Sequence, residues 1–277
     1  MNREYIKKII EIALREDIKD KDITSELILP DNLKTKAFII SKEKGIICGL
    51  KIAKLVFQCV DKEIVFESLI KEGSEIYPGQ KIAKIFGNAK KILLAERTAL
   101  NFLQHLSGIA TLTRKFVDKV KFYNVEIFDT RKTLPGLRIL EKYAVRVGGG
   151  KNHRFNLSDQ ILIKGNHIDL VGLENAIKRA KKSKKPLEVE VRDLRELEKI
   201  LDLNLKIDVI MLDNMKTNEI KRAIKMIKKR AKIEVSGRVN LNNVKEIAKL
   251  GVDRISVGKI THSSKAIDIS LKIEKLN

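Results

Sequence analysis

The hydrophobic residues of this chain follow two different periodicities, and the pattern changes near residue 108. Apolar residues recur at helical spacing over residues 1–16 and again over Leu50–Val60. Short apolar runs bounded by glycine and proline predict strands at Lys36–Ile47, Ile64–Ile70 and Lys81–Phe86. We therefore expect residues 1–108 to form an N-terminal domain that mixes helices with a sheet.

A long helical pattern over Leu93–Val120 leads into a region where short apolar runs alternate with helices. The apolar runs predict strands at Val125–Phe128, Ile161–Ile163, Leu187–Val191, Val209–Leu212, Ile233–Val235 and Arg254–Val257. Helical patterns separate the later runs, at Leu170–Lys182, Leu194–Leu201, Thr217–Lys229 and Asn242–Leu250. This alternation is typical of a parallel sheet built from repeated βα units. We expect a second domain over residues 109–264, followed by a C-terminal helix over 265–277 that packs on the first domain.

Polar residues follow most of these predicted strands, and their distribution favours an α/β barrel over an open doubly wound sheet. Barrels collect functional groups from the C-terminal ends of many strands at one mouth. A dinucleotide-binding sheet instead carries a G-x-G-x-x-G turn after its first strand. The glycine triplet Gly148–Gly150 follows no predicted strand, so that motif is absent.

Composition narrows the class of protein. The chain has 277 residues, of which 43% are hydrophobic, and it carries a formal charge of +21. Aromatic residues make up only 5%, which argues against the base-stacking surfaces of nucleic-acid-binding proteins. No apolar run is long enough to span a membrane, and the N-terminal sequence lacks an apolar signal core. We expect a cytoplasmic globular protein that binds neither nucleic acid nor membranes.

Arginine is concentrated in one part of a chain that otherwise uses lysine as its cation. Six arginines fall within this stretch: Arg97, Arg114, Arg131, Arg138, Arg146 and Arg154. The guanidinium group grips carboxylate or phosphate through two parallel hydrogen bonds, which an ammonium cannot do. The region around Asp129–His167 therefore predicts a binding site for a small, multiply charged anion.

Candidate functional residues stand at the ends of the predicted strands. Arg131 and Lys132 follow the first strand, and the flexible Gly148–Gly150 precedes His153-Arg154. Lys164 ends the second strand, where it serves either as an anion clamp or as a Schiff-base nucleophile. Two carboxylates, Glu190 and Asp213, end the next strands and suit a Mg²⁺ ion that bridges a diphosphate, while Ser236, Gly237 and Gly258 suit a phosphate cradle.

Several long motifs, in this order, resemble the quinolinate phosphoribosyltransferase family. They are Glu96–Thr111, Asp129–Arg138, Lys142–Arg146, Gly148–Arg154, Ile163–His167, Glu188–Val191, Met211–Asn214, Glu234–Gly237 and Ile255–Gly258. The resemblance implies an N-terminal α/β sandwich and an incomplete, open α/β barrel of the type II phosphoribosyltransferase kind. It also implies an activity, the transfer of phosphoribose from 5-phosphoribosyl 1-diphosphate to quinolinate with loss of CO₂, which yields nicotinate mononucleotide for NAD synthesis.

The resemblance assigns roles to individual residues. For quinolinate it implies Arg97 from a partner subunit together with Arg131, Lys132, His153, Arg154 and Lys164. For phosphoribosyl diphosphate it implies Lys132, Lys164, Glu190, Asp213, Ser236, Gly237 and Gly258. Lys132, Lys164, Glu190 and Asp213 would act in catalysis, and the last two would hold Mg²⁺. Family members form homodimers with shared active sites, so we expect a homodimer or a higher oligomer.

Two positions leave the assignment open. Arg238 stands where the family motif has a second glycine, so its effect on phosphate binding is undetermined. Glu188 and Glu190 lie two residues apart and face the same side of a strand, so periodicity does not decide which one is functional.

Three other functions compete with this interpretation. One is a related phosphoribosyltransferase that acts on another heteroaromatic acid. Another is an aldolase-like barrel that forms a Schiff base through Lys164, which leaves the arginine cluster unexplained. A third is an RNA-binding protein driven by net charge, whose affinity would fall steeply with salt.

Overall fold

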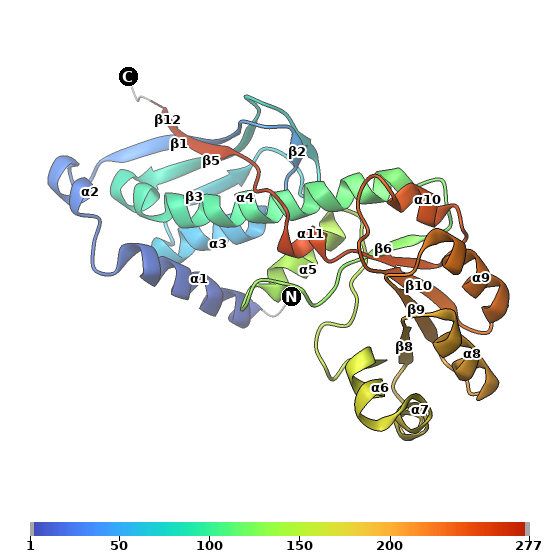
Figure 1. The fold of residues 1–277 in the computed structure, drawn as a ribbon. Helices are drawn as coiled ribbons and strands as arrows, with labels where there is room; N and C mark the ends of the chain where they lie inside the picture. The colour runs from blue at the N-terminus through green and yellow to red at the C-terminus, as the bar shows by residue number, and fades with distance from the viewer. Residues whose placement is uncertain (1–2, 275–277) are drawn as a thin grey trace. The chain divides into compact units, whose positions relative to one another are not determined.

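The computed structural model describes residues 3–274, and within them the chain forms two compact units (Figure 1). The first unit comprises residues 3–114, 133–149 and 263–274, and the second comprises residues 115–132 and 150–262. The sequence predicts one boundary, at residue 108, whereas the chain passes between the units several times. None of the helices in the described part is long and apolar enough to span a membrane.

The first unit is built on an antiparallel sheet. Its strands follow the order β12-β1-β5-β3. The strands are β1 (Lys34–Ser41), β3 (Val65–Ser68), β5 (Lys81–Asn88) and β12 (Ile269–Glu274), with a separate pair β2 (Gly45–Ile46) and β4 (Glu75–Ile76). The helices are α1 (Arg3–Ile18), α2 (Ile23–Ile28), α3 (Leu50–Val60), α5 (Arg138–Val147) and the first part of α4 (Ala89–Val120). The prediction of a mixed N-terminal domain is confirmed.

The predicted C-terminal helix over 265–277 is wrong in its described part. Residues Ile269–Glu274 form β12, which pairs with β1 in a register that joins Ser41 to Ile269 and Lys36 to Glu274. The reason lies in the spacing of Ile267, Ile269, Leu271 and Ile273, which alternate at the period of a strand. Ile269 is buried and Leu271 is half-buried, whereas Ile273 is exposed, so the alternation gives the first part of this strand an inward face. Residues 275–277 lie outside the described residues.

Gly108 lies inside α4 and does not end it. A Cβ at this position would lie 2.2 Å from the carbonyl oxygen of Lys265, closer than any real contact. Glycine is therefore required here because another segment of the same unit crosses the helix at its surface. The helix continues through this point into the second unit without a break.

The second unit is an open α/β barrel built on a parallel sheet. The strands are β6 (Glu126–Phe128), β7 (Ile161–Ile163), β8 (Leu187–Val191), β9 (Val209–Asp213), β10 (Lys232–Ser236) and β11 (Arg254–Ser256). They follow the order β6-β11-β10-β9-β8-β7, and every pair is parallel. Because β6 and β7 are the two ends of this order, the barrel stays incomplete, as the sequence predicts.

Short helices connect these strands. They are α6 (Gly165–Val171), α7 (Leu173–Ala180), α8 (Leu194–Asp202), α9 (Thr217–Ile227), α10 (Val244–Ala248) and α11 (Lys259–His262). The sequence predicts one helix over Leu170–Lys182, and the structure divides it at Gly172. Gly172 has a φ of 77°, a left-handed value that interrupts the helix and that glycine adopts without strain.

Candidate active site

A cavity of about 650 Å³ opens at the C-terminal ends of the barrel strands. Its walls come from the second unit alone. The lining residues are Thr130, Arg131, Lys132, His153, Arg154, Leu162, Lys164, Glu190, Met211, Asp213, Asn214, Ser236, Gly237, Arg238, Val239, Ser256, Val257, Gly258, Lys259 and His262. Its size is that of an ordinary small-molecule site, and its position is where barrel enzymes bind their substrates.

The charges of this cavity are strongly one-sided. Six lysine and arginine side chains line it, against two carboxylates. The Nε atom of Arg131 is buried and forms no hydrogen bond with any residue that the structure describes. Cations held this close together without enough counter-charge favour a bound anion with several negative charges.

The structure brings together ten of the residues singled out from the sequence. They are Arg131, Lys132, His153, Arg154, Lys164, Glu190, Asp213, Ser236, Gly237 and Gly258. Arg97 is the exception, because it is exposed on α4 in the first unit and does not line the cavity.

Glu190 and Asp213 stand on the neighbouring strands β8 and β9, close to Lys164. The Lys164 Nζ atom lies 2.7 Å from Glu190 Oε2, and the Gly165 N–H donates to Glu190 Oε1 at 3.3 Å. Asp213 accepts a hydrogen bond from the Asn214 side chain at 2.7 Å. Burial raises the pKa of Asp213, and the neighbouring charge of Glu190 raises it further. Two carboxylates that repel each other at the mouth of a pocket have the donor chemistry for a divalent cation.

The structure distinguishes Glu190 from Glu188, which the sequence leaves open. Glu190 is partly exposed and lines the cavity. Glu188 is fully buried one step deeper on the same strand. Glu190 is therefore the carboxylate that a ligand in the cavity reaches.

The loop after β10 has a backbone that few residues adopt. Gly237 and Arg238 both have positive φ, at 90° and 52°. A Cβ on Gly237 would lie 2.4 Å from Asn214 Oδ1, so this position requires glycine. At Arg238 a non-glycine residue accepts a left-handed conformation, and the side-chain amide of Asn243 donates to its carbonyl oxygen at 3.1 Å. The arginine side chain lines the cavity, where it adds a cation to the loop after β10.

Several functional candidates were missed by sequence reasoning. Lys259 and His262 lie on α11, the short helix that follows Gly258 directly, and both line the cavity. The sequence could have indicated both residues, because they follow Gly258 at the end of a predicted strand. Asn214 also lines the cavity, next to Asp213, and its φ of 56° marks a turn that asparagine tolerates.

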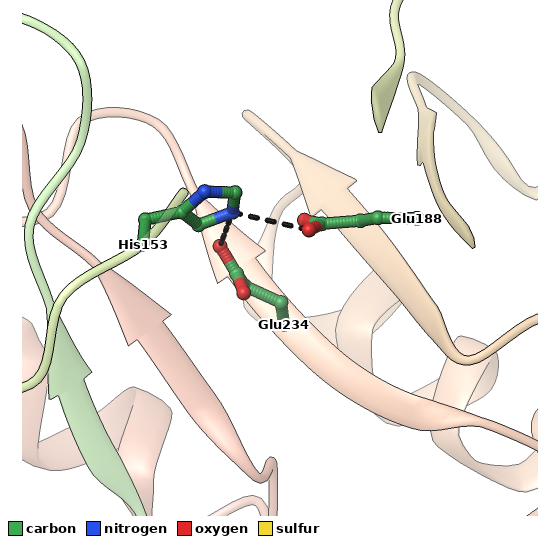
Figure 2. A group of neighbouring side chains, drawn as sticks. All are labelled: His153, Glu188 and Glu234. Atoms are coloured by element: carbon green, nitrogen blue, oxygen red, sulfur yellow. Dashed lines mark ion pairs between the residues drawn. The ribbon is translucent and has the colours of Figure 1, made fainter. Parts of the chain in front are cut away.

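His153 is held from both sides beneath this cavity. Its backbone N–H donates to Asp129 Oδ1 at 2.8 Å, which ties it to the residue after β6. Its Nδ1 atom accepts a hydrogen bond from the Arg154 N–H at 2.8 Å. Figure 2 shows the other nitrogen, Nε2, between the carboxylates of Glu188 on β8 and Glu234 on β10, at 3.1 and 3.6 Å.

His153, Glu188 and Glu234 have the residue types of a metal site, and their ligand atoms lie within 4.8 Å of one another. The tautomer of the ring argues against that use. Because Nδ1 accepts the Arg154 N–H, we assign the ring proton to Nε2, which then has no free electron pair for a metal. The cluster is better described as a buried histidine that lies between two carboxyl groups.

Glu234 is fully buried, and its surroundings favour its protonated form. Burial raises its pKa from 4.5 to about 7, and the charge of Glu188 contributes in the same direction. His153, Ser256 and Arg254 lower the pKa to a smaller extent. The Ser256 hydroxyl donates to Glu234 Oε1, so the carboxyl group keeps a hydrogen-bond partner.

The raised pKa of Glu234 makes the folding stability of the protein depend on pH. The native state binds a proton at Glu234 that the unfolded chain releases near pH 4.5, so wild-type stability falls as the pH rises from about 4.5 through about 7. Glu234→Gln replaces the carboxyl group with a neutral isostere and removes this loss. We expect the melting temperature of the variant, relative to that of the wild type, to increase as the pH rises from about 5 to about 8. Thermal unfolding of both proteins across that range measures this difference. A difference that stays constant with pH would contradict the assignment.

Comparisons with known proteins agree with this geometry. The family models "Quinolinate phosphoribosyl transferase, N-terminal domain" and "C-terminal domain" match residues 22–107 and 109–272. A probable nicotinate-nucleotide pyrophosphorylase [carboxylating] from Methanocaldococcus jannaschii is 45% identical, over 99% of each chain. A chloroplastic enzyme of that name from Arabidopsis thaliana is 40% identical, over 97% of this chain and 83% of its own length.

Solved structures give the same result. The nicotinate-nucleotide pyrophosphorylase from Francisella tularensis superposes with a TM-score of 0.93 at 42% identity, covering 99% of this chain and 98% of that one. The two family models together match most of the chain, and the relatives align over nearly its whole length. This chain belongs to the quinolinate phosphoribosyltransferase family.

Proposed function

We propose that the cavity transfers phosphoribose from 5-phosphoribosyl 1-diphosphate to quinolinate, releasing diphosphate and CO₂ and forming nicotinate mononucleotide. The observation that carries the proposal is the arrangement of six cations and two carboxylates at the mouth of one open barrel. The relatives named as carboxylating nicotinate-nucleotide pyrophosphorylases align with almost the entire chain, which supports the same activity here. The product is a precursor in NAD synthesis, and the enzyme is a pentosyltransferase.

Quinolinate binds to the part of the cavity formed by the segments after β6 and before β7. Its two carboxylates need paired cations when they leave water, and Arg131 and Arg154 supply guanidinium forks for this purpose. Burial and the charge of Arg131 lower the pKa of Arg154, as expected for two neighbouring arginines with no anion bound between them. Lys132 and Lys164 add charge at the border with the second substrate, and His153 lines the same wall.

The ribose diphosphate binds on the other strands. Ser236, Gly237 and Gly258 form a cradle for the 5-phosphate, and Arg238 adds a cation to this cradle. Glu190 and Asp213 would hold Mg²⁺, since they offer hard oxygen donors and repel each other when no cation is present. When bound, the metal neutralises the diphosphate and makes it a better leaving group.

The reaction needs orientation and charge stabilisation but no covalent enzyme intermediate. The arginines hold the ring so that its nitrogen faces the anomeric carbon, and the C–N bond forms as the diphosphate leaves. Positive charge that develops on the ribose is stabilised by Glu190 and Asp213. The ring nitrogen is then cationic, so it stabilises the electron pair that remains on the neighbouring ring carbon when the carboxylate departs as CO₂. That carbon then takes up a proton.

The Schiff-base alternative is disfavoured by one contact. Lys164 Nζ lies 2.7 Å from Glu190 Oε2, so the two side chains form an ion pair. An ammonium has no free electron pair with which to attack a carbonyl carbon. Lys164 therefore serves as an anion-binding cation.

An assay of carbon dioxide tests this function. With carboxyl-labelled quinolinate, the wild-type protein should release CO₂ only when 5-phosphoribosyl 1-diphosphate and Mg²⁺ are both present, because decarboxylation requires the N-ribosyl bond. Asp213→Asn should lower kcat by roughly 100-fold or more, since it removes charge that stabilises the transition state. Release of CO₂ without the ribose donor, or full activity in the presence of a chelator, would contradict the proposal.

We also propose a homodimer in which Arg97 of the partner subunit completes the quinolinate site. Arg97 is exposed on α4 and does not line the cavity of its own chain. An arginine in a family motif that is left at the surface is suited to a role between chains. The proposal accounts for the position of Arg97 without any rearrangement of the barrel.

Mixed dimers test this arrangement. Arg97→Ala and Asp213→Asn should each be nearly inactive, since each variant has a defect in every site of its homodimer. After the two variants are unfolded and refolded together, half of the dimers are mixed, and each mixed dimer has one intact site. We expect recovery of about a quarter of wild-type activity, from this statistical count for a twofold dimer. Lack of recovery in preparations shown by mass to contain mixed dimers would contradict shared sites.

A further inference from the structure

Arg154 is attached to the protein at both of its ends. Its backbone N–H donates to His153 Nδ1 at 2.8 Å. Its guanidinium Nη1 donates to the carbonyl oxygen of Gln160 at 3.1 Å. The side chain is only partly buried, so these two contacts determine where its remaining donors face in the cavity.

Both attachments lead to the same buried atom. His153 Nε2 lies 3.1 Å from Glu188 Oε2, and the Gln160 side-chain amide donates to that same oxygen at 2.7 Å. The contacts thus form a closed ring, from Glu188 through His153 to the backbone of Arg154, and from its guanidinium through Gln160 back to Glu188. Glu188 is fully buried and does not line the cavity, so it acts on a ligand only through other residues.

We propose that Glu188 is a positioning residue for dicarboxylate binding, which fixes Arg154 through His153 and Gln160. The proposal rests on the function proposed above and identifies the residue that orders its acid-binding half. It also assigns a role to His153. Since Nδ1 accepts from Arg154 and Nε2 faces the buried carboxylates, the ring contributes by holding Arg154 and donates no hydrogen bond to the substrate.

The charge of Glu188 matters as well as its position. A carboxylate is a stronger acceptor than the neutral amide oxygen of a glutamine, because its charge strengthens the hydrogen bonds and ion pairs that it forms. His153 Nε2 and the Gln160 amide both contact the single oxygen Oε2, so Glu188→Gln keeps the shape of the side chain and one shared acceptor but removes the negative charge that holds these two groups. We therefore expect Arg154 to become mobile without a cavity forming in the core.

Glu234 provides a matched control. It is equally buried, and it is also close to His153, at 3.6 Å from Nε2. Its other contacts are with Ser256 and Arg254, however, and no hydrogen bond in the described part of the chain joins it to Gln160 or Arg154. Glu234→Gln thus removes a buried carboxyl group at nearly the same place while it preserves the ring of contacts.

The experiment measures binding of phthalate, a benzene dicarboxylate that mimics the two carboxylates of quinolinate and does not react, together with steady-state kinetics. Glu188→Gln should raise the Kd for phthalate and the KM for quinolinate about tenfold, the loss expected when a charge-assisted hydrogen bond becomes a neutral one. The kcat and the KM for 5-phosphoribosyl 1-diphosphate should stay within about twofold of wild type. Glu234→Gln should leave all four values within about twofold.

A double-mutant cycle separates positioning from general destabilisation. Arg154→Lys keeps the positive charge but loses the guanidinium contact with Gln160. In that background Glu188→Gln should weaken phthalate binding by less than about threefold, because residues that act as one unit give non-additive effects. Additive effects, or equal losses for both substrates, would mean a merely structural role and would overturn the proposal.

Two further results also bear on it. Zinc present at one equivalent in the purified wild-type protein and lost in Glu188→Gln would overturn the proposal in favour of a metal site. If the wild-type protein binds phthalate and Glu188→Gln weakens that binding, but quinolinate releases no CO₂, then the proposed function fails and the positioning role stands.

Discussion

The repulsion between cations held in one small cavity is the constraint on which this structure depends. Arg131, Lys132, Arg154 and Lys164 stand around the acid-binding side, where their positive charges repel one another. The barrel balances part of this charge with carboxylates at two depths. Glu190 and Asp213 lie at the mouth, and Glu188 lies beneath it, close to Glu234, whose protonated form is favoured. The remaining positive charge is available to a substrate that carries several negative charges.

The two depths of carboxylate follow from the geometry of parallel strands. Residues two apart on a strand face the same side, so Glu188 and Glu190 on β8 both face the inside of the barrel. The same relation joins Glu234 to Ser236 on β10 and Ser256 to Gly258 after β11. At β8 and β10 the outer residue lines the cavity and the inner residue is buried below it, whereas at β11 both Ser256 and Gly258 line the cavity. A substitution in the inner layer therefore acts on binding indirectly, through groups such as His153.

Much of the fold and most of the cavity could be predicted from the sequence, because both depend on regular patterns. The six barrel strands are short apolar runs, and Lys164, Glu190 and Asp213 are conspicuous because a charged residue lies at or beside the end of each of these three runs. The error at β12 arose from a pattern that was present, since Ile267 to Ile273 alternate as in a strand. The contact of His153 with Glu188 and Glu234 had no such signal. It joins a loop to two strands that are far apart in the sequence, and only the folded barrel brings them together.

The central claim is that this cavity recognises two carboxylates at once. It is tested most directly by calorimetry, which compares the binding of quinolinate with that of nicotinate, a pyridine with one carboxylate. Nicotinate lacks one of the two carboxylates, so guanidinium groups in the complex are left without a partner. We expect this to weaken the binding free energy by about 2–3 kcal/mol, or roughly 30- to 150-fold in Kd. The account predicts a weaker affinity for nicotinate by at least that factor. Equal affinities for the two acids would contradict it.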